Sequence, residues 1–354
     1  MTLTKQCVRP SSSNKWRAWL FIYRLKANTG IAGLAIILVT FIVSLASIVV
    51  VNLTYSTFLS GRSTGMVERQ LQAEYALKSL VNVAAALIAA DQSPRVDSAE
   101  DVWGVFMQGA PVPDDMLQQL GFTESGIKVW LEITPENAKL RIDQLDTQNL
   151  QSNAGQQTGK RWKDVYTALF KKLHFDDELA KPDHTGLFPN QVFNSEELAE
   201  NLETYQRTDV DNNNSNLPTN NGKITRIGDL INIPGFTPKR ISVLTPFVTV
   251  YGNSRVNVNV AKKSVLEALD PDLNAQLIID YRNEKSIENI GELREVIGED
   301  VFQNLAGRIN TETSWFQVIG KIEFGGGISY FARAIISAEG GAQTKTNLVS
   351  LQLY

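Results

Sequence analysis

Cysteine and histidine are scarce in this chain of 354 residues, which contains one cysteine, Cys7, and two histidines, His174 and His184. A single cysteine excludes an intramolecular disulfide and a cluster of thiolate metal ligands. Neither histidine belongs to an H-E-x-x-H motif, the arrangement that places two zinc ligands on one face of a helix. We therefore do not expect a zinc hydrolase.

The sequence also lacks a Walker loop and the glycine fingerprint of dinucleotide-binding proteins. Three consecutive glycines, Gly325, Gly326 and Gly327, lie between two strand-like runs, where a hairpin turn explains them. His174 lies close to Asp176 and Asp177, a common arrangement on protein surfaces. These features predict a protein that is not an enzyme.

Charged residues are missing from a long segment near the N-terminus. No charged side chain occurs from Ile31 to Gly61, and the run from Ile31 to Val51 is almost entirely apolar. As a helix, this run would be about 30 Å long, which matches the hydrocarbon core of a bilayer. It predicts a membrane span.

The distribution of charge predicts the orientation of that span. Residues 1–30 contain six basic and no acidic side chains, whereas the rest of the chain has 28 basic and 38 acidic side chains, a net charge of -10. Basic residues before a span favour a cytoplasmic N-terminus. In a bacterium, the chain would be a single-pass protein of the inner membrane with its C-terminal part in the periplasm.

Helical character continues beyond the span, because no proline occurs from Arg62 to Ala90. Apolar residues recur there at helical spacing and form one stripe, which must pack on something. The stripe consists of Leu77, Leu80, Val81, Ala84 and Leu87.

After Pro94 the pattern changes to short elements. The sequence predicts short strands at residues 128–133, 139–142 and 255–260, and a terminal antiparallel sheet from strands at 315–324, 328–338 and 347–354. Between these strands lie amphipathic helical runs, at residues 161–173, 194–206, 224–233, 237–244, 265–269, 273–282 and 287–296. A Pro-Gly turn at Pro234 and Gly235 joins two of the helical runs, which is typical of a helix-hairpin-helix or SAM-like module.

Several segments together resemble a known family. They are the uncharged span, QAEYA at 72–76, ITRIGDLINIPGFTPKRISVLTPFVTV at 224–250, VNVNVAKKSVLEAL at 256–269, YRNEKSIENIGEL at 281–293 and SWFQVIG at 314–320. In this order they look like the type II secretion system minor pseudopilin K, also called general secretion pathway protein K. The resemblance covers nearly all of the chain after residue 30.

The resemblance implies an α+β, pilin-like fold in which a long N-terminal transmembrane helix packs on a small antiparallel sheet, with a large SAM-like or helix-hairpin-helix α-helical domain inserted. The expected boundaries are a basic cytoplasmic leader at 1–30, a transmembrane segment at 31–62, the first part of the pilin-like domain at 63–145, the inserted domain at 146–310 and the terminal strands at 311–354.

The resemblance also implies the function and the partners. Proteins of this family form the tip of the periplasmic pseudopilus with minor pseudopilins I and J, and they initiate its assembly for protein export across the outer membrane. The expected partners of this chain are therefore pseudopilins I and J, other pseudopilus subunits, the prepilin peptidase and the inner-membrane secretion platform. We expect the apolar stripe from Leu77 to Leu87 and the span to pack against the N-terminal helices of partner subunits.

Processing by the peptidase would remove the leader. Transferred to this sequence, the cut falls after Gly30 and makes Ile31 the new, methylated N-terminus, with Gly33 as the rival cleavage position and an uncleaved anchor as the alternative. Ala35 then stands where most pilins have a glutamate that meets the positive N-terminus of a neighbour. A tip subunit has no neighbour above it, and an unpaired carboxylate in the membrane would cost several kcal/mol.

Acidic and amide side chains alternate at Asp209, Asp211 and Asn213, as in calcium-binding loops. The resemblance includes a calcium ion held by an acidic loop in this region, so these three residues are candidate ligands. An EF-hand loop would have glycine at Asn214 and glutamate at Asn220. A solvated, asparagine-rich linker is an equally good interpretation.

The alternative from another class is a membrane-anchored, periplasmic protein that binds nucleic acid during DNA uptake, because helix-hairpin-helix units also bind DNA. Such hairpins present backbone amides to phosphate, but here Phe236 and Thr237 follow Gly235, so the second glycine is missing. The acidic charge of the chain also opposes phosphate binding. Nucleic acid is therefore the less favoured partner.

Overall fold

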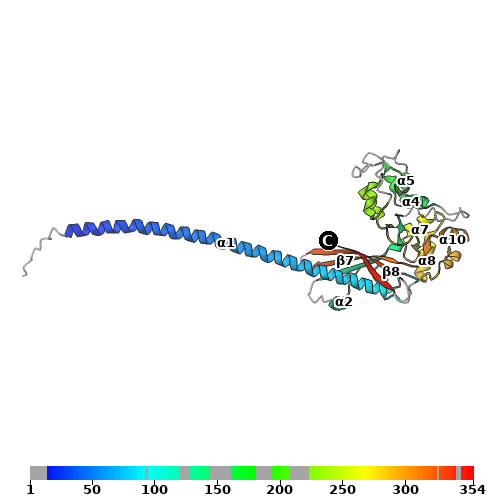
Figure 1. Ribbon diagram of the computed structural model, residues 1–354, viewed down its shortest axis with the longest axis horizontal. Coiled ribbons are helices and arrows are strands. Elements are labelled where there is room, and N and C mark those ends of the chain that lie inside the picture. Colours follow the sequence, from blue (N-terminus) through cyan, green and yellow to red (C-terminus); the bar gives the residue numbers. More distant parts are fainter. Residues whose placement is uncertain are drawn as a thin grey trace, which may run out of the picture. The chain divides into compact units, whose positions relative to one another are not determined.

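The computed structural model describes residues 14–91, 95–119, 127–143, 161–180, 193–206, 223–324, 327–339 and 344–354 (Figure 1). The chain divides into two compact units, residues 1–72 and 73–354. The helix α1 (Asn14–Ala89) begins in the first unit and ends in the second.

In the first unit, α1 carries exposed large apolar side chains from Leu34 to Leu59. By length and composition, α1 is the one helix in the described part of the chain that could cross a membrane. The hydroxyl groups of Thr40, Ser47 and Thr54 donate to carbonyl oxygens four residues earlier, at 2.8–2.9 Å. These polar groups are therefore satisfied within the helix, as a lipid environment requires.

The second unit contains an antiparallel sheet of five strands in the order β1-β2-β7-β8-β9. The strands are β1 (Ala110–Pro111), β2 (Lys128–Pro135), β7 (Trp315–Phe324), β8 (Ile328–Glu339) and β9 (Lys345–Leu353). Alternate residues of β2 and β7 are buried, because each strand presents one face to a core. We call this buried side the inner face of the sheet.

The part of α1 that belongs to the second unit packs on the inner face. It lies close to β7, because Gly320 has no side chain: a Cβ atom there would lie 2.8 Å from Cδ2 of Leu80. The short 3₁₀ helix η1 (Val102–Phe106) places the ring of Trp103 edge-on to that of Phe316, at 5.2 Å between centroids. The strands and α1 enclose one hydrophobic core, which we call the sheet core.

The described residues between β2 and β7 form a second, largely helical region with its own hydrophobic core. Its helices are α4 (Trp162–Lys172), α5 (Ser195–Gln206), α6 (Pro238–Leu244), α7 (Lys263–Leu269), α8 (Ala275–Glu284), α9 (Leu293–Ile297) and α10 (Glu299–Leu305). The 3₁₀ helices η2 (Glu136–Ala138), η3 (Phe175–Ala180), η4 (Ile227–Asn232) and η5 (Ile290–Glu292) connect them. The short helix α2 (Asp114–Gln119) lies outside this region, between β1 and β2.

Two predicted strands are shorter than expected and lie outside the main sheet. From residues 139–142 only β3 (Leu140–Arg141) forms, and it pairs in parallel with β4 (Val248–Thr249). From residues 255–260 only β5 (Val256–Asn257) forms, in parallel with β6 (Ile309–Asn310). In both places the alternating sequence pattern forms a strand of only two residues, which pairs in parallel with a segment far away in the chain.

The ends of the helices follow local capping chemistry. The side chain of Asn194 caps the start of α5, because it accepts hydrogen bonds from the backbone N–H groups of Glu196 and Glu197. The first helix of the Pro-Gly module is the short 3₁₀ helix η4, which is separated by one residue from the turn at Pro234 and Gly235, where Gly235 adopts a φ of +88°. In α6, Thr237 is the cap.

Candidate functional site

The predicted partner-packing stripe lies inside this subunit. Leu77, Leu80, Val81 and Ala84 are at most 2 % exposed in the sheet core, and Leu87 is partly buried against it. These side chains are therefore not available to a partner helix, and the expectation that they contact partners is wrong. The spacing identified the buried face of the helix, but this chain's own sheet covers that face.

The processing residues lie in the first unit. Gly30 and Ile31 are within α1, and the helix runs on through Ala35, whose side chain is exposed. No acidic residue occurs in the exposed apolar segment from Leu34 to Leu59. This segment requires a lipid environment or apolar helices of other subunits to cover it. Cleavage after Gly30 stays a prediction.

The candidate calcium ligands Asp209, Asp211 and Asn213 lie outside the described residues. In the described part of the chain, one other group of carboxylates comes together, where oxygen atoms of Asp91, Asp97 and Asp101 lie within 4.8 Å of one another. The pKa of the Asp97 carboxyl is raised to about 8, chiefly by burial, and the nearby carboxylates of Asp91 and Asp101 contribute to this rise.

Asp97 follows α1 in the chain and contacts Thr311 and Thr313, which lie between the helical region and β7. Its carboxylate accepts a hydrogen bond from the backbone N–H of Thr313 at 2.6 Å, and its backbone N–H donates to the carbonyl of Thr311. The buried amide of Asn257 donates to the carbonyls of Asp97 and Thr311 and to the hydroxyl of Thr313, at 2.9–3.1 Å. We call this set of contacts the Asp97 junction.

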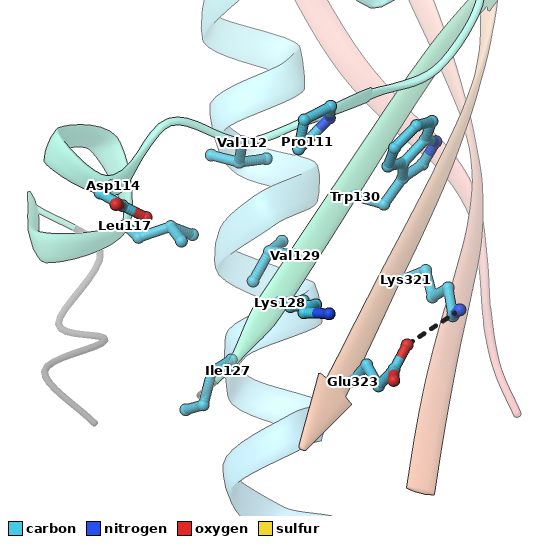
Figure 2. A pocket seen from close by; sticks show the side chains of 10 residues that line it. All are labelled: Pro111, Val112, Asp114, Leu117, Ile127, Lys128, Val129, Trp130, Lys321 and Glu323. Carbon is cyan, nitrogen blue, oxygen red and sulfur yellow. Dashed lines mark hydrogen bonds and ion pairs between the residues drawn. The ribbon is translucent and has the colours of Figure 1, made fainter. Parts of the chain in front are cut away.

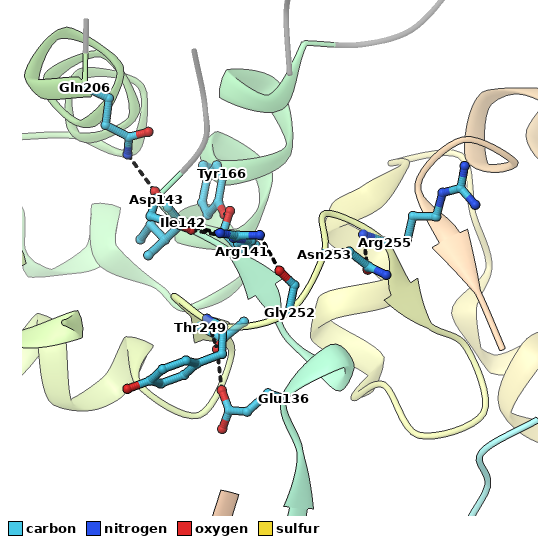
Figure 3. A network of polar contacts seen from close by, with 11 residues as sticks. Glu136, Arg141, Ile142, Asp143, Tyr166, Gln206, Thr249, Gly252, Asn253 and Arg255 are labelled. Atoms are coloured by element: carbon cyan, nitrogen blue, oxygen red, sulfur yellow. Dashed lines mark hydrogen bonds and ion pairs between the residues drawn. The ribbon is translucent and has the colours of Figure 1, made fainter. Parts of the chain in front are cut away.

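A second polar network fixes the start of the helical region, directly after β2 (Figure 3). Glu136 forms a buried ion pair with Lys139 at 2.6 Å and accepts a hydrogen bond from the hydroxyl of Thr249. The side chain of Asn137 joins both ends of the region, because it donates to Asn253 and accepts from the backbone N–H of Ser314, each at 3.1 Å. The two polar sets hold the helical region to the sheet.

The remaining contacts in Figure 3 anchor α4 and α5 to β3. The hydroxyl of Tyr166 donates to the carbonyl of Arg141 at 2.6 Å, and the amide of Gln206 donates to the carbonyl of Ile142 at 2.6 Å. Arg141 itself pairs with Asp143 and donates to the carbonyl of Gly252. These groups are engaged in structural contacts.

The hairpin at Pro234 and Gly235 packs against the helical core. A Cβ atom at Gly235 would lie 2.5 Å from Cδ2 of Leu198, so the turn is pressed against α5. The guanidinium of Arg240, 6 % exposed, donates to the carbonyls of Gly235, Phe175 and Phe193. The turn and the guanidinium of Arg240 are therefore engaged inside the protein, whereas phosphate binding needs accessible backbone amides and cations.

A hollow of about 470 Å³ lies beside β2 (Figure 2). Pro111, Val112 and Leu117 border it on the side of β1 and α2, and Trp130 lies across β2 from them. Two other lining residues, Lys321 and Glu323, form an ion pair at 3.3 Å. None of the residues predicted as sites lines this hollow.

Two arrangements that could suggest catalysis have structural explanations. Residues 61–65, GRSTG, match the G-x-S-x-G pattern of a hydrolase, but they lie within α1, whereas that chemistry needs a turn between a strand and a helix. His174 contacts Asp177 at 2.9 Å, and both side chains are more than three-quarters exposed. Two side chains this exposed to solvent do not form the positioned pair that acid–base catalysis needs.

A long N-terminal apolar helix, an antiparallel sheet on its C-terminal part and a helical region inserted between two strands define a pilin-like fold with an inserted helical domain. Among solved structures, the chain is similar to a chain of the GspK-GspI-GspJ complex from the type 2 secretion system of enterotoxigenic Escherichia coli, with a TM-score of 0.57 and 16 % identity. The match covers 81 % of this chain and 99 % of that chain. It confirms the predicted fold class, a GspK-like pilin fold.

Comparison of the sequence with protein-family models and with curated proteins found no match.

Proposed function

We propose that this chain is a minor pseudopilin of a type II secretion system. The observation that carries the proposal is the fold, which the chain shares over most of its length with a chain from the GspK-GspI-GspJ complex. The exposed apolar segment of α1 supports it, because a pseudopilin needs such a segment first in the membrane and later among the helices of a fibre.

The proposed mechanism is mechanical and involves no catalysis. The apolar segment holds the subunit in the inner membrane, with the N-terminus in the cytoplasm and the second unit in the periplasm. Pseudopilins I and J then assemble with it, and the helical region occupies the position where a further subunit would add. The subunit thereby forms the tip of the pseudopilus and initiates its growth for protein export.

In this proposal, a prepilin peptidase cuts after Gly30, and the new N-terminus at Ile31 is methylated before the secretion platform adds the subunit to the fibre. Calcium held by Asp209, Asp211 and Asn213 is part of the proposal too, since carboxylate and amide oxygens are the ligands that this ion prefers.

The experiment that tests the proposal combines processing with partner capture. The full chain is expressed with and without a prepilin peptidase, and its intact mass and N-terminal sequence are determined. We expect a peptidase-dependent, methylated start at Ile31 and recovery of pseudopilins I and J with the affinity-tagged protein. Gly30→Leu should block cleavage, whereas Gly33→Leu, at the rival position, should leave it unchanged.

Two results would contradict the proposal. A start at Met1 in both strains would reduce the protein to an uncleaved membrane anchor. Failure to recover either pseudopilin from membranes that contain all three proteins would remove the assembly function.

A further inference from the structure

The inner face of the sheet extends further than the elements that cover it. In β9, Leu348 lies opposite Ile336, and Leu353 lies opposite Ala332. Residues that are directly opposite each other in an antiparallel pair point to the same face. Since Ile336 and Ala332 belong to the sheet core, Leu348 and Leu353 also face the side on which α1 packs.

The exposure of this side changes abruptly from β8 to β9. Ile336 and Ala332 are fully buried, whereas Leu348 and Leu353 remain 52 % and 37 % exposed. Between them, Leu351 packs at the margin of the sheet core. The apolar surface of β9 is therefore continuous with the core, but the described elements leave much of it open to solvent.

The spacing of the strands indicates what shape would fit there. The contact of Leu80 with Gly320 places α1 over β7, and β9 lies two strands away. Strands are about 4.8 Å apart, so this displacement is about 10 Å. Packed helices have interaxial distances of about 8–10 Å. A second helix in ordinary contact with α1 would thus lie over β9.

The opposite flank of α1 is already occupied. The helix η1 lies there, with Trp103 against Phe316 and Phe106 buried in the same core. On the other flank, exposed apolar side chains of β9 continue the inner face and offer a surface for another helix.

We propose that the inner side of β9, formed by Leu348, Leu351 and Leu353, is the seat for an apolar α-helix of a neighbouring pseudopilin, which packs beside α1. This inference rests on the proposed function and names the surface through which the subunit receives its neighbour. The seat carries no charge, because residues 346–354 contain no charged side chain, so it matches a helix with an uncharged apolar face.

A helix fits this seat better than an added strand or a second copy joined edge to edge. A strand would have to pair with the free edge of β9, but a register shift between Ile335 and Ile336 makes β9 irregular near Val349. Such bulges interrupt the ladder of hydrogen bonds and protect edges from pairing. The exposed leucines, in contrast, remain available to a packed side chain.

The test uses two neighbouring residues of β9 as a matched pair in the full chain. Leu348 points to the inner face, and Asn347, opposite Ser337, points to the other face; both are exposed. Leu348→Asp and Asn347→Asp add the same charge to the same strand. In membranes that contain pseudopilins I and J, we expect Leu348→Asp to lower their recovery about tenfold and Asn347→Asp to leave it unchanged. Unchanged melting temperatures show that both variants fold.

A photocrosslinking amino acid at either position gives a second measurement that does not depend on a loss of binding. We expect position 348 to crosslink to the N-terminal helix of pseudopilin I or J, as identified by mass spectrometry, and position 347 not to do so. If both pseudopilins are recovered but neither variant matters and position 348 gives no helix adduct, the seat is wrong while the proposed function stands. An adduct between two copies of this chain, or with a strand, also overturns it. If the wild type recovers no pseudopilin, the function and the seat fail together.

Discussion

At the scale of single residues, Asp97 is an acid whose folded environment opposes its charge. Its pKa is raised from 3.8 to about 8, chiefly by burial. The folded state therefore binds a proton more tightly than the unfolded state, and this group makes the free energy of unfolding fall as the pH rises from about 4 to about 8. Below that range the effect is fully favourable, and above it the effect is lost.

Replacement by asparagine tests this dependence. The asparagine side chain cannot ionise and still offers an oxygen to the N–H of Thr313, so Asp97→Asn should abolish a slope of roughly 1 kcal/mol per pH unit and stabilise the protein at pH 8. The measurement is urea unfolding from pH 5 to pH 8 with a chelator, so that no cation offsets the charge of the carboxylates. Equal slopes for both proteins would show that Asp97 does not titrate in this range.

Leu80 and Gly320 are coupled by direct contact, and a double-mutant cycle can measure this. Leu80→Ala should cost about 2–5 kcal/mol of unfolding free energy because it leaves a cavity, and Gly320→Ala about 1–3 kcal/mol because the new methyl group meets the leucine. Together they should cost less than the sum, since alanine at 80 makes room. Tyr75→Ala and Gly307→Ala are controls, because the tyrosine is 69 % exposed and no atom lies within 4 Å of a Cβ at Gly307. Additive losses would contradict the contact.

The sequence alone identified which face of the helix is apolar but not what covers it. Helical spacing at Leu77, Leu80 and Ala84 shows that the side chains share a face, and any apolar surface can satisfy that face. Here the cover is the inner face of β7 and β8, whose position depends on pairing across the whole helical region. The Asp97 junction could not be predicted from the sequence either, because Asp97, Asn257 and Thr313 are far apart in the chain.

At the scale of elements, long periodic segments were predictable and short bridges were not. The alternation over 315–324 and 328–338 specified β7 and β8 almost to the residue, because a ten-residue strand with one buried face repeats its signal several times. The two-residue strands β3 and β5 carry no such repetition. Their parallel partners at Val248 and Ile309 are set by how the helices pack, so sequence suggested longer strands in their place.

The Asp97 junction should control how firmly the helical region is held to the sheet. Asn257→Ala removes one donor from three buried acceptors, and an unsatisfied buried group costs about 1–3 kcal/mol. We expect faster hydrogen exchange at the amides of Asp97 and Thr313, which donate within this junction. Exchange in β8 should change less, because its ladders to β7 and β9 stay intact.

The control for that experiment is Asn82→Ala, which removes the same amide from an exposed position of α1 and should change stability by less than about 0.5 kcal/mol. A uniform rise in exchange over the whole second unit in Asn257→Ala would show that the junction supports global folding and not a local attachment.

At the scale of the whole molecule, the long apolar helix that could cross a membrane was the easiest feature to predict. The uncharged run from Ile31 to Gly61 can be recognised from the sequence alone, because a candidate membrane span is defined by its length and hydrophobicity and not by a specific partner in the fold. The candidate calcium loop is the opposite case: alternating oxygens at Asp209 and Asp211 indicate a ligand set only if the backbone curves around an ion.

We expect the second unit to fold without the first unit, and a truncated chain can test this. Among the residues that the structure describes, both hydrophobic cores begin at or after Ala73, and neither core includes a side chain of the first unit. A chain that starts at Gln72 should therefore be soluble without detergent and keep the melting temperature of the full chain in detergent within about 4 °C. The measurement is thermal unfolding followed by circular dichroism, together with centrifugation to separate membranes.

The same truncation distinguishes folding from assembly. If the fold is independent of the apolar segment, the shortened chain should melt cooperatively yet stay out of the membrane fraction, in which we expect the full chain. A shortened chain that melts without a transition would show that the segment before Ala73 supports the cores. Cooperative melting would show that the second unit folds without this segment, as expected if the apolar side chains serve a role other than the stability of the part that follows.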